Sequence, residues 1–576
     1  MTLLHNDPRS FADEALSGFA AAHHDLVRAI DGGVVRASAT PPGQVAVVLG
    51  GGTGHYPAFA GWVGPGFAHG AACGNIFASP SASQICSVAR ASQAGGGVIF
   101  AFGNYAGDVL HFGQAAEQLR AEGIDVRVLR VTDDIASGPA DDPALRRGIA
   151  GDLPVMKILG AAAEAGLGID EAERIGRKAN DATRSLGMAF SGCTLPGADH
   201  PLFTVAPGRM GVGLGIHGEP GIDERDLPSA DTVADLLVDG VLAESKRASA
   251  AVGNADRVAV LLNGLGATKY EELYVVFRRV AERLAREGFH VIAPEVGEQV
   301  TSLGMAGLSL TVTFLDDELR QLWTAPALTP AFRRGLVQPR PPRTDDISGT
   351  HQLPPVVRGG DASRAAAACI AAALRIVRDT VTTHETRLGD IDAVAGDGDH
   401  GIGMRRGSEA AADAAAEAVA LGAGARSTLS RAGAAWSERA GGTSGALWGA
   451  ALTAFGSALD DTEPADRGRL VAGVRAAVDA VLRLGGARLG DKTLVDAAVP
   501  FVDRLEAALP GTDFGSAWVE AAEAATEAAE ATATIAARRG RARTHGERSL
   551  GTPDAGAVSF ALIVTALGDF IRPHSS

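Results

Sequence analysis

VAVVLGGGTGHYP, residues Val45–Pro57, runs from a short apolar stretch directly into a loop of glycines. The stretch VAVVL predicts a buried β-strand. The loop fits neither the GxGxxG spacing of a dinucleotide-binding turn nor the GxxxxGK(S/T) spacing of a P-loop. A backbone without Cβ atoms can come close to a phosphate or a polyhydroxyl ligand, although a plain strand-to-helix turn uses the same residues. The sequence therefore predicts a strand that ends in a candidate ligand-binding loop.

Further strand candidates lie in the first part of the chain, to about residue 330, and helical patterns separate them. This alternation predicts an α/β domain with largely parallel or mixed sheets. Helical periodicity is clearest in residues 108–123 and 271–288. The further strand candidates are residues 98–102, 126–131, 258–262, 290–294 and 308–315.

The second part of the chain has a different composition. Residues 324–360 are rich in proline and lack periodicity, which is typical of a linker. Beyond them, alanine-rich segments such as residues 364–379, 407–422 and 517–540 carry strong helix formers and few β-branched runs. The sequence therefore predicts an all-helical second domain.

The length, composition and net charge of the chain narrow the classes of protein to which it could belong. A chain of 576 residues exceeds what one core supports, and 46% apolar with 21% charged residues is typical of packed domains. The net charge of −16 argues against nucleic acid or an anionic membrane as partner. Four cysteines form no CxxC pair, and the N-terminus lacks the pattern of a signal peptide. Asp569 interrupts the most apolar segment, residues 555–571, so a buried helix is expected there and a cytoplasmic protein overall.

Two more glycine-flanked segments carry polar side chains that could act in chemistry. Residues 103–112, GNYAGDVLHF, place Asp108 just beyond the carboxyl end of a predicted strand, where open α/β sheets bind ligands. Residues 211–221, GVGLGIHGEPG, hold His217 in an otherwise apolar run. A lone histidine is more often structural. Together with His55 of the first loop, however, these residues indicate polar groups that converge on one site.

The segment DAVAGDGDHG, Asp392–Gly401, crowds the carboxylates of Asp392, Asp397 and Asp399. Like charges at this spacing repel one another unless a cation lies between them, so the segment is either a solvated loop or a metal site. The spacing of an EF-hand is not met, because Ser408 stands where its bidentate glutamate would be. Glycines are needed to turn all three side chains inward, since a straight helix would not place them on one face.

Nine segments together resemble the dihydroxyacetone kinase family in its single-chain form. They follow the family's order from about residue 45 to about residue 560. Five are K-domain motifs: GGGTGHYPAFAGWVG, NIFASPSA, NYAGDV, GIHGEPG and TSLGMAGLSLTVTFLDDEL. Four are L-domain motifs: GDGDHGIGM, GGTSGALWG, GDKTLVDA and GRARTHGERSLGTPDAGA.

The resemblance implies an order of domains. Residues 1–333 would form the ketose-binding K domain, with two α/β subdomains that divide near residues 185–195. Residues 334–362 would form a proline-rich linker. Residues 363–576 would form the L domain, an all-α helical barrel that binds ATP and magnesium.

The resemblance also assigns catalytic roles. His217 would add a ring nitrogen to the substrate carbonyl and hold the ketose as a hemiaminal. Imidazole is a competent nucleophile toward an unhindered ketone, and covalent capture selects a ketone against a plain polyol. His55 and Asp108 stand at family positions for the base that deprotonates the accepting hydroxyl. The family positions that line the sugar are Gly52, Thr53, Gly54, His55, Ser79, Gly103 and Asp108.

In the L domain, the resemblance implies that Asp392, Asp397 and Asp399 hold two Mg²⁺ ions on the nucleotide phosphates. Oxygen-only ligands suit Mg²⁺, and the ions would offset the negative charge that opposes phosphoryl transfer. Arg541 could equally be a solvated helix end. The family positions around ATP are His400, Gly401, Ile402, Gly403, Thr443, Ser444, Gly485, Leu494, Arg541, Asp554, Ala555 and Gly556.

This chain departs from the common form of the family at three positions in the K domain. Many dihydroxyacetone kinases have glutamate, histidine and lysine where this chain has Tyr56, Phe59 and Gly103. The missing lysine removes a cation beside Asp108 and opens volume, which suits a ketose with one more CHOH group. These variants resemble the erythrulose kinase branch, so erythrulose, alone or alongside dihydroxyacetone, is the expected substrate.

Other functions remain open from the sequence. Some family members are also FAD-AMP lyases that form cyclic FMN at the L-domain metal site, and that reaction would not require His217. A non-catalytic ketose-binding protein is a further alternative, although such relatives lack parts of the catalytic set. The fused L domain argues against phosphate supply by a phosphotransferase protein. The resemblance implies a homodimer in which the L domain of one subunit serves the K domain of the other.

Overall fold

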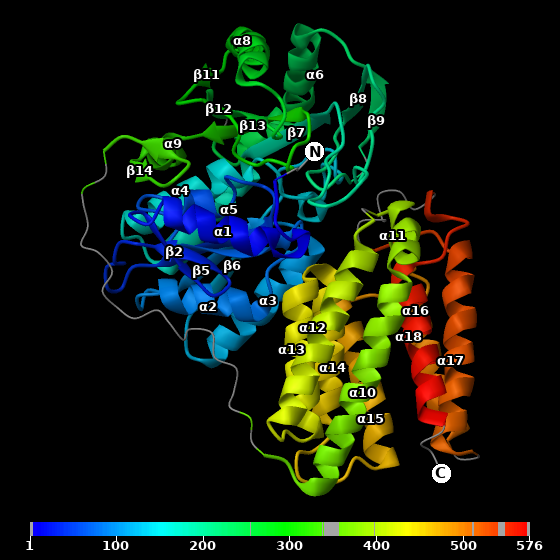
Figure 1. Cartoon of the computed structure of the whole chain (residues 1–576). Helices are drawn as coiled ribbons and strands as arrows, with labels where there is room; N and C mark the ends of the chain where they lie inside the picture. The colour runs from blue at the N-terminus through cyan, green and yellow to red at the C-terminus, as the bar shows by residue number, and fades with distance from the viewer. Residues whose placement is uncertain are drawn as a thin grey trace. The chain divides into compact units, whose positions relative to one another are not determined.

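The computed structural model of the chain forms two compact units, residues 1–352 and 353–576 (Figure 1). Most of the predicted linker, residues 334–362, lies outside the described residues. Short 3-10 helices occur at Pro8–Ser10, Ala60–Trp62, Pro143–Leu145 and Thr532–Thr534. The structure describes residues 4–219, 221–253, 255–336, 338, 356, 358–396, 398–509, 512–539 and 548–572.

A six-stranded mixed sheet is the centre of the first subdomain, in the order β1-β2-β4-β3-β5-β6. Strands β4, β3, β5 and β6 run parallel, and β1 and β2 add an antiparallel edge. The predicted strands at 45–49, 98–102 and 126–131 correspond to β3, β5 and β6. The strands are β1 (Val27–Ile30), β2 (Gly33–Arg36), β3 (Ala46–Thr53), β4 (Gly70–Ile76), β5 (Val98–Gly103) and β6 (Val126–Val131).

Helices cover both faces of this sheet (Figure 1). Val48 and Phe100 pack with α2 and α3, whereas Val47 and Ile99 belong to the core that α1, α4 and α5 share. Alternate residues of one strand therefore enter two different cores, which explains why the strands are apolar throughout. The helices are α1 (Phe11–Ala22), α2 (Ala82–Ser92), α3 (Ala106–Ala121), α4 (Asp152–Glu164) and α5 (Ile169–Asp181).

A second, seven-stranded mixed sheet follows, in which β10 lies between β13 and the parallel strands β11 and β12. Helices α6 and α8 pack beside each other over it. The predicted division at 185–195 overlaps β7, through which the chain enters this sheet. The elements are β7 (Thr183–Ala189), β8 (Arg209–Val212), β9 (Asp223–Asp226), α6 (Ala230–Leu242), α7 (Ser245–Ala250), β10 (Arg257–Gly264), α8 (Tyr270–Arg286), β11 (His290–Val291), β12 (Glu295–Gly297), β13 (Gly307–Leu315), α9 (Asp317–Thr324), β14 (Ala327–Leu328) and β15 (Arg333–Arg334).

The second unit is a ring of antiparallel helices (Figure 1). From α12 to α18 each helix contacts the next, α10 contacts α12, and α18 returns to α10 and closes the ring. The described part of this unit has no strand, which agrees with the predicted all-α barrel. The helices are α10 (Asp361–Thr383), α11 (Glu385–Ala393), α12 (His400–Ala420), α13 (Ala425–Ala440), α14 (Gly442–Ser457), α15 (Arg467–Gly485), α16 (Val495–Ala508), α17 (Phe514–Ala531) and α18 (Ala555–Ile571).

The most apolar helix, α18, belongs to this ring. Its residues Ile563 and Val564 lie in the cores that it shares with α10 and α17, and the Trp518 ring nitrogen donates to the carbonyl of Val564 at 2.8 Å. Within the described ranges, no helix has both the length and the apolar character needed to span a bilayer. The prediction that residues 555–571 form a buried helix is therefore confirmed.

Candidate active site

Two histidines from distant parts of the first unit meet in its interior. His55 lies in the glycine-rich loop after β3, and His217 lies in the loop between β8 and β9. Their Nε2 atoms are 3.0 Å apart, and both side chains are almost fully buried. The structure thus brings together the two histidines that the sequence predicts for catalysis.

Hydrogen bonds at the outer ring nitrogens define the protonation of this pair. Nδ1 of His55 is 2.7 Å from the carbonyl of Thr301, which can only accept, so Nδ1 of His55 carries a proton. Nδ1 of His217 is 3.0 Å from Oε1 of Glu219, and a carboxylate there also accepts. Both Nδ1 atoms then carry a proton. A hydrogen bond between the two Nε2 atoms needs one more proton, which lies between them. The pair therefore shares one positive charge beside the carboxylate of Glu219.

Aromatic rings enclose the two histidines and keep water away from them. The ring of Phe77 stacks on His55 at 4.9 Å, and the ring of Tyr105 meets His217 edge-on at 4.7 Å. Burial, followed by the nearby charge of His217, lowers the pKa of His55 to about 3. His55 is therefore the neutral partner of the pair at physiological pH.

Glycines of the first loop are required by close packing against Phe77. A Cβ atom at Gly52 would lie 2.7 Å from the backbone nitrogen of Ala78, and one at Gly54 would lie 2.8 Å from the ring of Phe77. Gly54 also has a φ of +104°. The hydroxyl of Thr53 donates to the carbonyl of Gly74 at 2.6 Å, so this side chain holds the loop to β4.

The remaining predicted sugar positions lie at the ends of neighbouring elements. Ser79 is buried in the loop before α2, two residues ahead of the helix cap Ser81. Gly103 is the last residue of β5, and Asp108 lies buried in the first turn of α3. Tyr105 caps the same helix and contacts His217, which places this turn beside the histidine pair.

In the helical unit, the predicted nucleotide positions gather where alternate helices begin. Because the helices run up and down around the ring, α12, α14, α16 and α18 all start at the same end. His400, the first residue of α12, links three of them: its ring nitrogens lie 2.9 Å from the hydroxyl of Ser559 in α18 and 3.3 Å from that of Ser444 in α14. A Cβ atom at Gly556 would lie 3.4 Å from the backbone nitrogen of Leu494, at the start of α16. Four helix N-termini together favour a polyanion such as a triphosphate.

The predicted nucleotide residues occupy these helix starts with two exceptions. Gly485 is the last residue of α15, where its backbone approaches Leu447 of α14. Arg541 lies outside the described residues. The others are His400, Gly401, Ile402 and Gly403 in the first turn of α12, Thr443 and Ser444 in that of α14, Leu494 as the cap of α16, and Asp554, Ala555 and Gly556 at the start of α18.

Aspartate side chains lie near one another at this end of the ring. Asp392 lies near the end of α11 and Asp399 caps α12. Burial, then the charges of Asp392 and Asp496, raises the pKa of Asp554 to about 7, a repulsion that a bound cation would relieve. Asp397 lies outside the described residues, and those described bring no three His, Cys, Asp or Glu side chains into a metal-ligating group. The oxygen-only donors suit Mg²⁺.

Comparison with known proteins shows a domain model of one family in each of the two units. The Dak1 domain model matches residues 17–331, and the DAK2 domain model matches residues 394–569. The chain belongs to the dihydroxyacetone kinase family. Its form is the single chain with a Dak1 domain followed by a DAK2 domain, and it is a kinase.

Relatives of this dihydroxyacetone kinase family member match it along nearly the whole chain. An L-erythrulose 1-kinase of Mycolicibacterium smegmatis is 60% identical over 99% of this chain and 100% of its own. A D-erythrulose kinase of the same organism is 52% identical over 99% of both chains. The crystal structure of the dihydroxyacetone kinase from C. freundii in complex with AMP-PNP and Mg²⁺ is 28% identical, with a TM-score of 0.53 over 99% of both chains.

Sequence reasoning for this kinase missed residues that support the histidine pair. Glu219 lies two residues after His217, and both its oxygens accept hydrogen bonds from that residue. Arg147 lies 3.9 Å from Glu219 and is fixed by Asp134 at 2.8 Å. Glu219 stands inside the motif GIHGEPG and could have been found there. Arg147 and Asp134 carry no local signal, since only the fold brings them to the loop.

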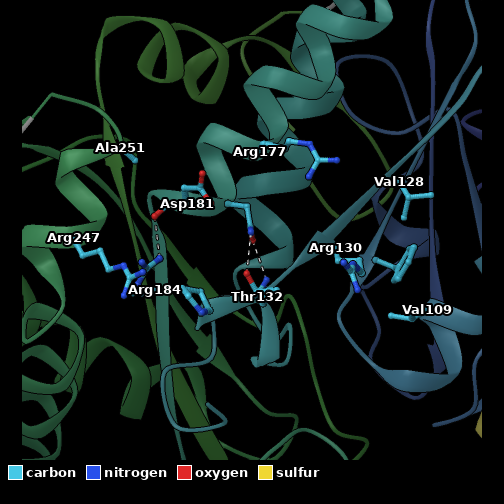
Figure 2. Close-up of a pocket in the computed structure, with 13 residues that line it drawn as sticks. Val109, Val128, Arg130, Thr132, Arg177, Asp181, Arg184, Arg247 and Ala251 are labelled. Carbon is cyan, nitrogen blue, oxygen red and sulfur yellow. Dashed lines mark hydrogen bonds between the residues drawn. The ribbon is translucent and has the colours of Figure 1, made fainter. Parts of the chain in front are cut away.

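A separate pocket of about 750 Å³ opens in the same unit (Figure 2). Four arginines line it together with Asp181. Arg184 pairs with Glu244 at 3.0 Å, and Arg247 donates to the carbonyl of Ala140, so these cations are used within the fold. None of the family's sugar positions is among the described residues that line it, and the buried histidine pair is therefore the better ketose site. The four are Arg130, Arg177, Arg184 and Arg247.

Proposed function

We propose that this kinase transfers the terminal phosphoryl group of ATP to a hydroxyl of erythrulose, which is held covalently on His217. The observation that carries the proposal is the 3.0 Å contact between the Nε2 atoms of His55 and His217. A carbonyl on one side and the carboxylate of Glu219 on the other orient both rings. This arrangement provides a nucleophile and a proton donor within one hydrogen bond of each other.

Capture of the ketose follows from the shared proton. When the ketone arrives, the proton between the rings moves to Nε2 of His55 and frees the lone pair on Nε2 of His217. That lone pair forms a bond to the carbonyl carbon, the π electrons move to the carbonyl oxygen, and this oxygen takes the proton from His55. The alkylated ring of His217 then bears the positive charge, and its Nδ1–H still donates to Glu219.

Phosphoryl transfer needs a base and a site for the phosphates. Asp108, buried in the first turn of α3, would accept the proton of the hydroxyl that becomes phosphorylated. Asp392, Asp397 and Asp399 would hold two Mg²⁺ ions, which offset the charge of the triphosphate. The starts of α12, α14, α16 and α18 would bind the phosphate oxygens through backbone N–H groups.

Gly103 supports a four-carbon substrate. A Cβ atom at this position would lie 3.2 Å from the carbonyl of Gly148 and 3.3 Å from the ring of Tyr105, so the fold leaves no room for a larger side chain without adjustment. Glycine at this position leaves the carbonyl of Gly148, the ring of Tyr105 and the carboxyl of Asp152 uncovered by a side chain of residue 103. Two of the three relatives named above are erythrulose kinases, one for the L and one for the D enantiomer.

A substrate panel tests the proposed function. With Mg²⁺ and ATP, we expect kcat/KM for one enantiomer of erythrulose to exceed that for dihydroxyacetone by about tenfold or more, since an extra hydroxyl that the site binds adds discrimination. Glycerol should not react, because it has no carbonyl to capture. A kcat/KM for dihydroxyacetone far above that for both enantiomers would refute the four-carbon substrate.

We further propose a homodimer in which the helical domain of one subunit serves the ketose domain of the other. Two inactive variants, His217→Ala and Asp392→Asn, should then restore activity when they are mixed and allowed to exchange subunits. A mixed dimer would carry one intact pair of domains, so an equal mixture should regain about a quarter of the wild-type rate. Continued inactivity of a mixture whose subunits have demonstrably exchanged would show that each subunit uses its own two domains.

A further inference from the structure

Asp152 is a buried carboxyl group that the fold itself does not use. It is the first residue of α4 and is only 2% exposed. Among the described residues, no hydrogen-bond partner reaches its Oδ1 atom. It does not cap its helix either, because the cap position is Gly151. Burying a polar atom without a partner costs about 1–3 kcal/mol, so the position calls for an explanation.

A neighbouring aspartate shows what a structural carboxylate looks like in this segment. Asp133 is also fully buried, but its two oxygens accept hydrogen bonds from the backbone nitrogens of Ile149 and Gly151 at 2.9 and 2.7 Å. Asp133 therefore holds the loop that leads into α4. Because Asp133 already holds this loop, the carboxyl of Asp152 is not needed to hold it.

Asp152 borders the predicted sugar positions. Its Oδ2 atom lies 3.4 Å from the place of a Cβ atom at Gly103, and the ring of Tyr105 lies 3.3 Å from the same place. Tyr105 in turn contacts His217. A side chain at position 103 would contact the carbonyl of Gly148, the ring of Tyr105 and the carboxyl of Asp152. Glycine leaves this carboxyl uncovered on the side of residue 103.

We propose that Asp152 is a specificity residue, whose carboxyl group hydrogen-bonds the hydroxyl that a four-carbon ketose has and dihydroxyacetone lacks. The inference rests on the proposed function, because it takes the ketose to lie beside Gly103 and His217. Burial, followed by the charges of Asp133 and Asp108, raises the pKa of Asp152 well above its usual range. A carboxyl group accepts a hydrogen bond in either protonation state, and the hydroxyl of a ketose can donate to it.

Replacing Asp152 with alanine tests this contact. We expect kcat/KM for erythrulose to fall by about 10- to 100-fold, whereas kcat/KM for dihydroxyacetone changes by less than about threefold. Asp152→Asn keeps a donor and an acceptor of similar size and should lose less than Asp152→Ala. The melting temperature of Asp152→Ala should not fall, since the variant removes a buried polar group that nothing in the fold satisfies.

Ligand-induced stabilisation gives a second readout that does not depend on ATP. Erythrulose should raise the melting temperature of the wild type but not of Asp152→Ala, and dihydroxyacetone should raise both equally. Asp170→Asn is the matched control: Asp170 also lies in the first turn of its helix, α5, but it is exposed and pairs with Arg127. It should behave as the wild type toward both ketoses.

The outcomes separate the inference from the function on which it rests. Equal losses on both ketoses, or no loss on either, would overturn the role of Asp152. A wild type that prefers dihydroxyacetone refutes the four-carbon substrate, yet a loss in Asp152→Ala confined to erythrulose would still support the contact. A wild type that phosphorylates neither ketose refutes the proposed function and the specificity role with it.

Discussion

Replacement of His217 with alanine should lower kcat for ketose phosphorylation by about 10³-fold or more. The variant loses the nitrogen that forms the bond to the substrate, and His55 loses the neighbour with which it shares a proton at 3.0 Å. Steady-state kinetics with erythrulose and ATP measures the loss. Intact-mass analysis after trapping should detect a ketose adduct on the wild type and none on the variant.

His290→Ala is the matched control for this substitution, because His290 is an exposed histidine of the same unit at the edge strand β11. It should keep wild-type kinetics. The same variants address the alternative lyase reaction, which would not use the ketose-binding histidine. FAD cleavage that survives in His217→Ala would therefore be a separate activity of the helical domain. Ketose phosphorylation that survives undiminished would refute covalent capture.

The orientation of His217 depends on Glu219. Its carboxylate fixes the ring by accepting from Nδ1 and also accepts from the backbone nitrogen of His217. In the proposed capture it would stay close to the positive charge, so the alkylated ring would not be an isolated buried cation. Arg147, held by Asp134, limits how strongly Glu219 attracts that charge.

Local patterns in the sequence predicted the strands and helices well where one element is long and uniform. The strand prediction at 126–131 matches β6, and that at 308–315 differs from β13 by one residue. The strand predicted at 290–294 is wrong in length: β11 ends at Val291, because Ala293 has a φ of +45° and Pro294 lacks an N–H. Such a break depends on backbone geometry that the apolar pattern does not report.

The site was predictable where its residues lie inside family motifs and unpredictable where the fold alone assembles it. His55 and His217 are 162 residues apart, and their glycine-flanked segments, together with the resemblance, predicted that they converge. Asp152 stands outside every quoted motif, and its burial beside Gly103 depends on how α4 meets the end of β5. A one-dimensional pattern records residue types, whereas a buried carboxyl without a partner is a property of packing.

Asp392→Asn should lower the rate of phosphoryl transfer by on the order of 10³-fold. Ketose capture should continue. The substitution removes one of the charges that would hold Mg²⁺ on the nucleotide, and an amide is a weaker ligand for a hard cation than a carboxylate. Erythrulose should still raise the melting temperature of the variant, because the histidine pair lies in the other unit. Nucleotide-binding measurements should show that the variant needs more Mg²⁺ than the wild type for the same ATP affinity.

Asp390→Asn provides the control, since Asp390 precedes Asp392 by two residues on α11 and is exposed. Asp390→Asn makes the same change of charge at nearly the same place. A general electrostatic effect would therefore change ATP binding equally in both variants. A loss confined to Asp392→Asn, with unchanged ketose binding, assigns the carboxylate to the metal. If both variants phosphorylated erythrulose at the wild-type rate, Asp392 would be a solvated loop residue, and the repulsion that raises the pKa of Asp554 would have no role in binding a cation.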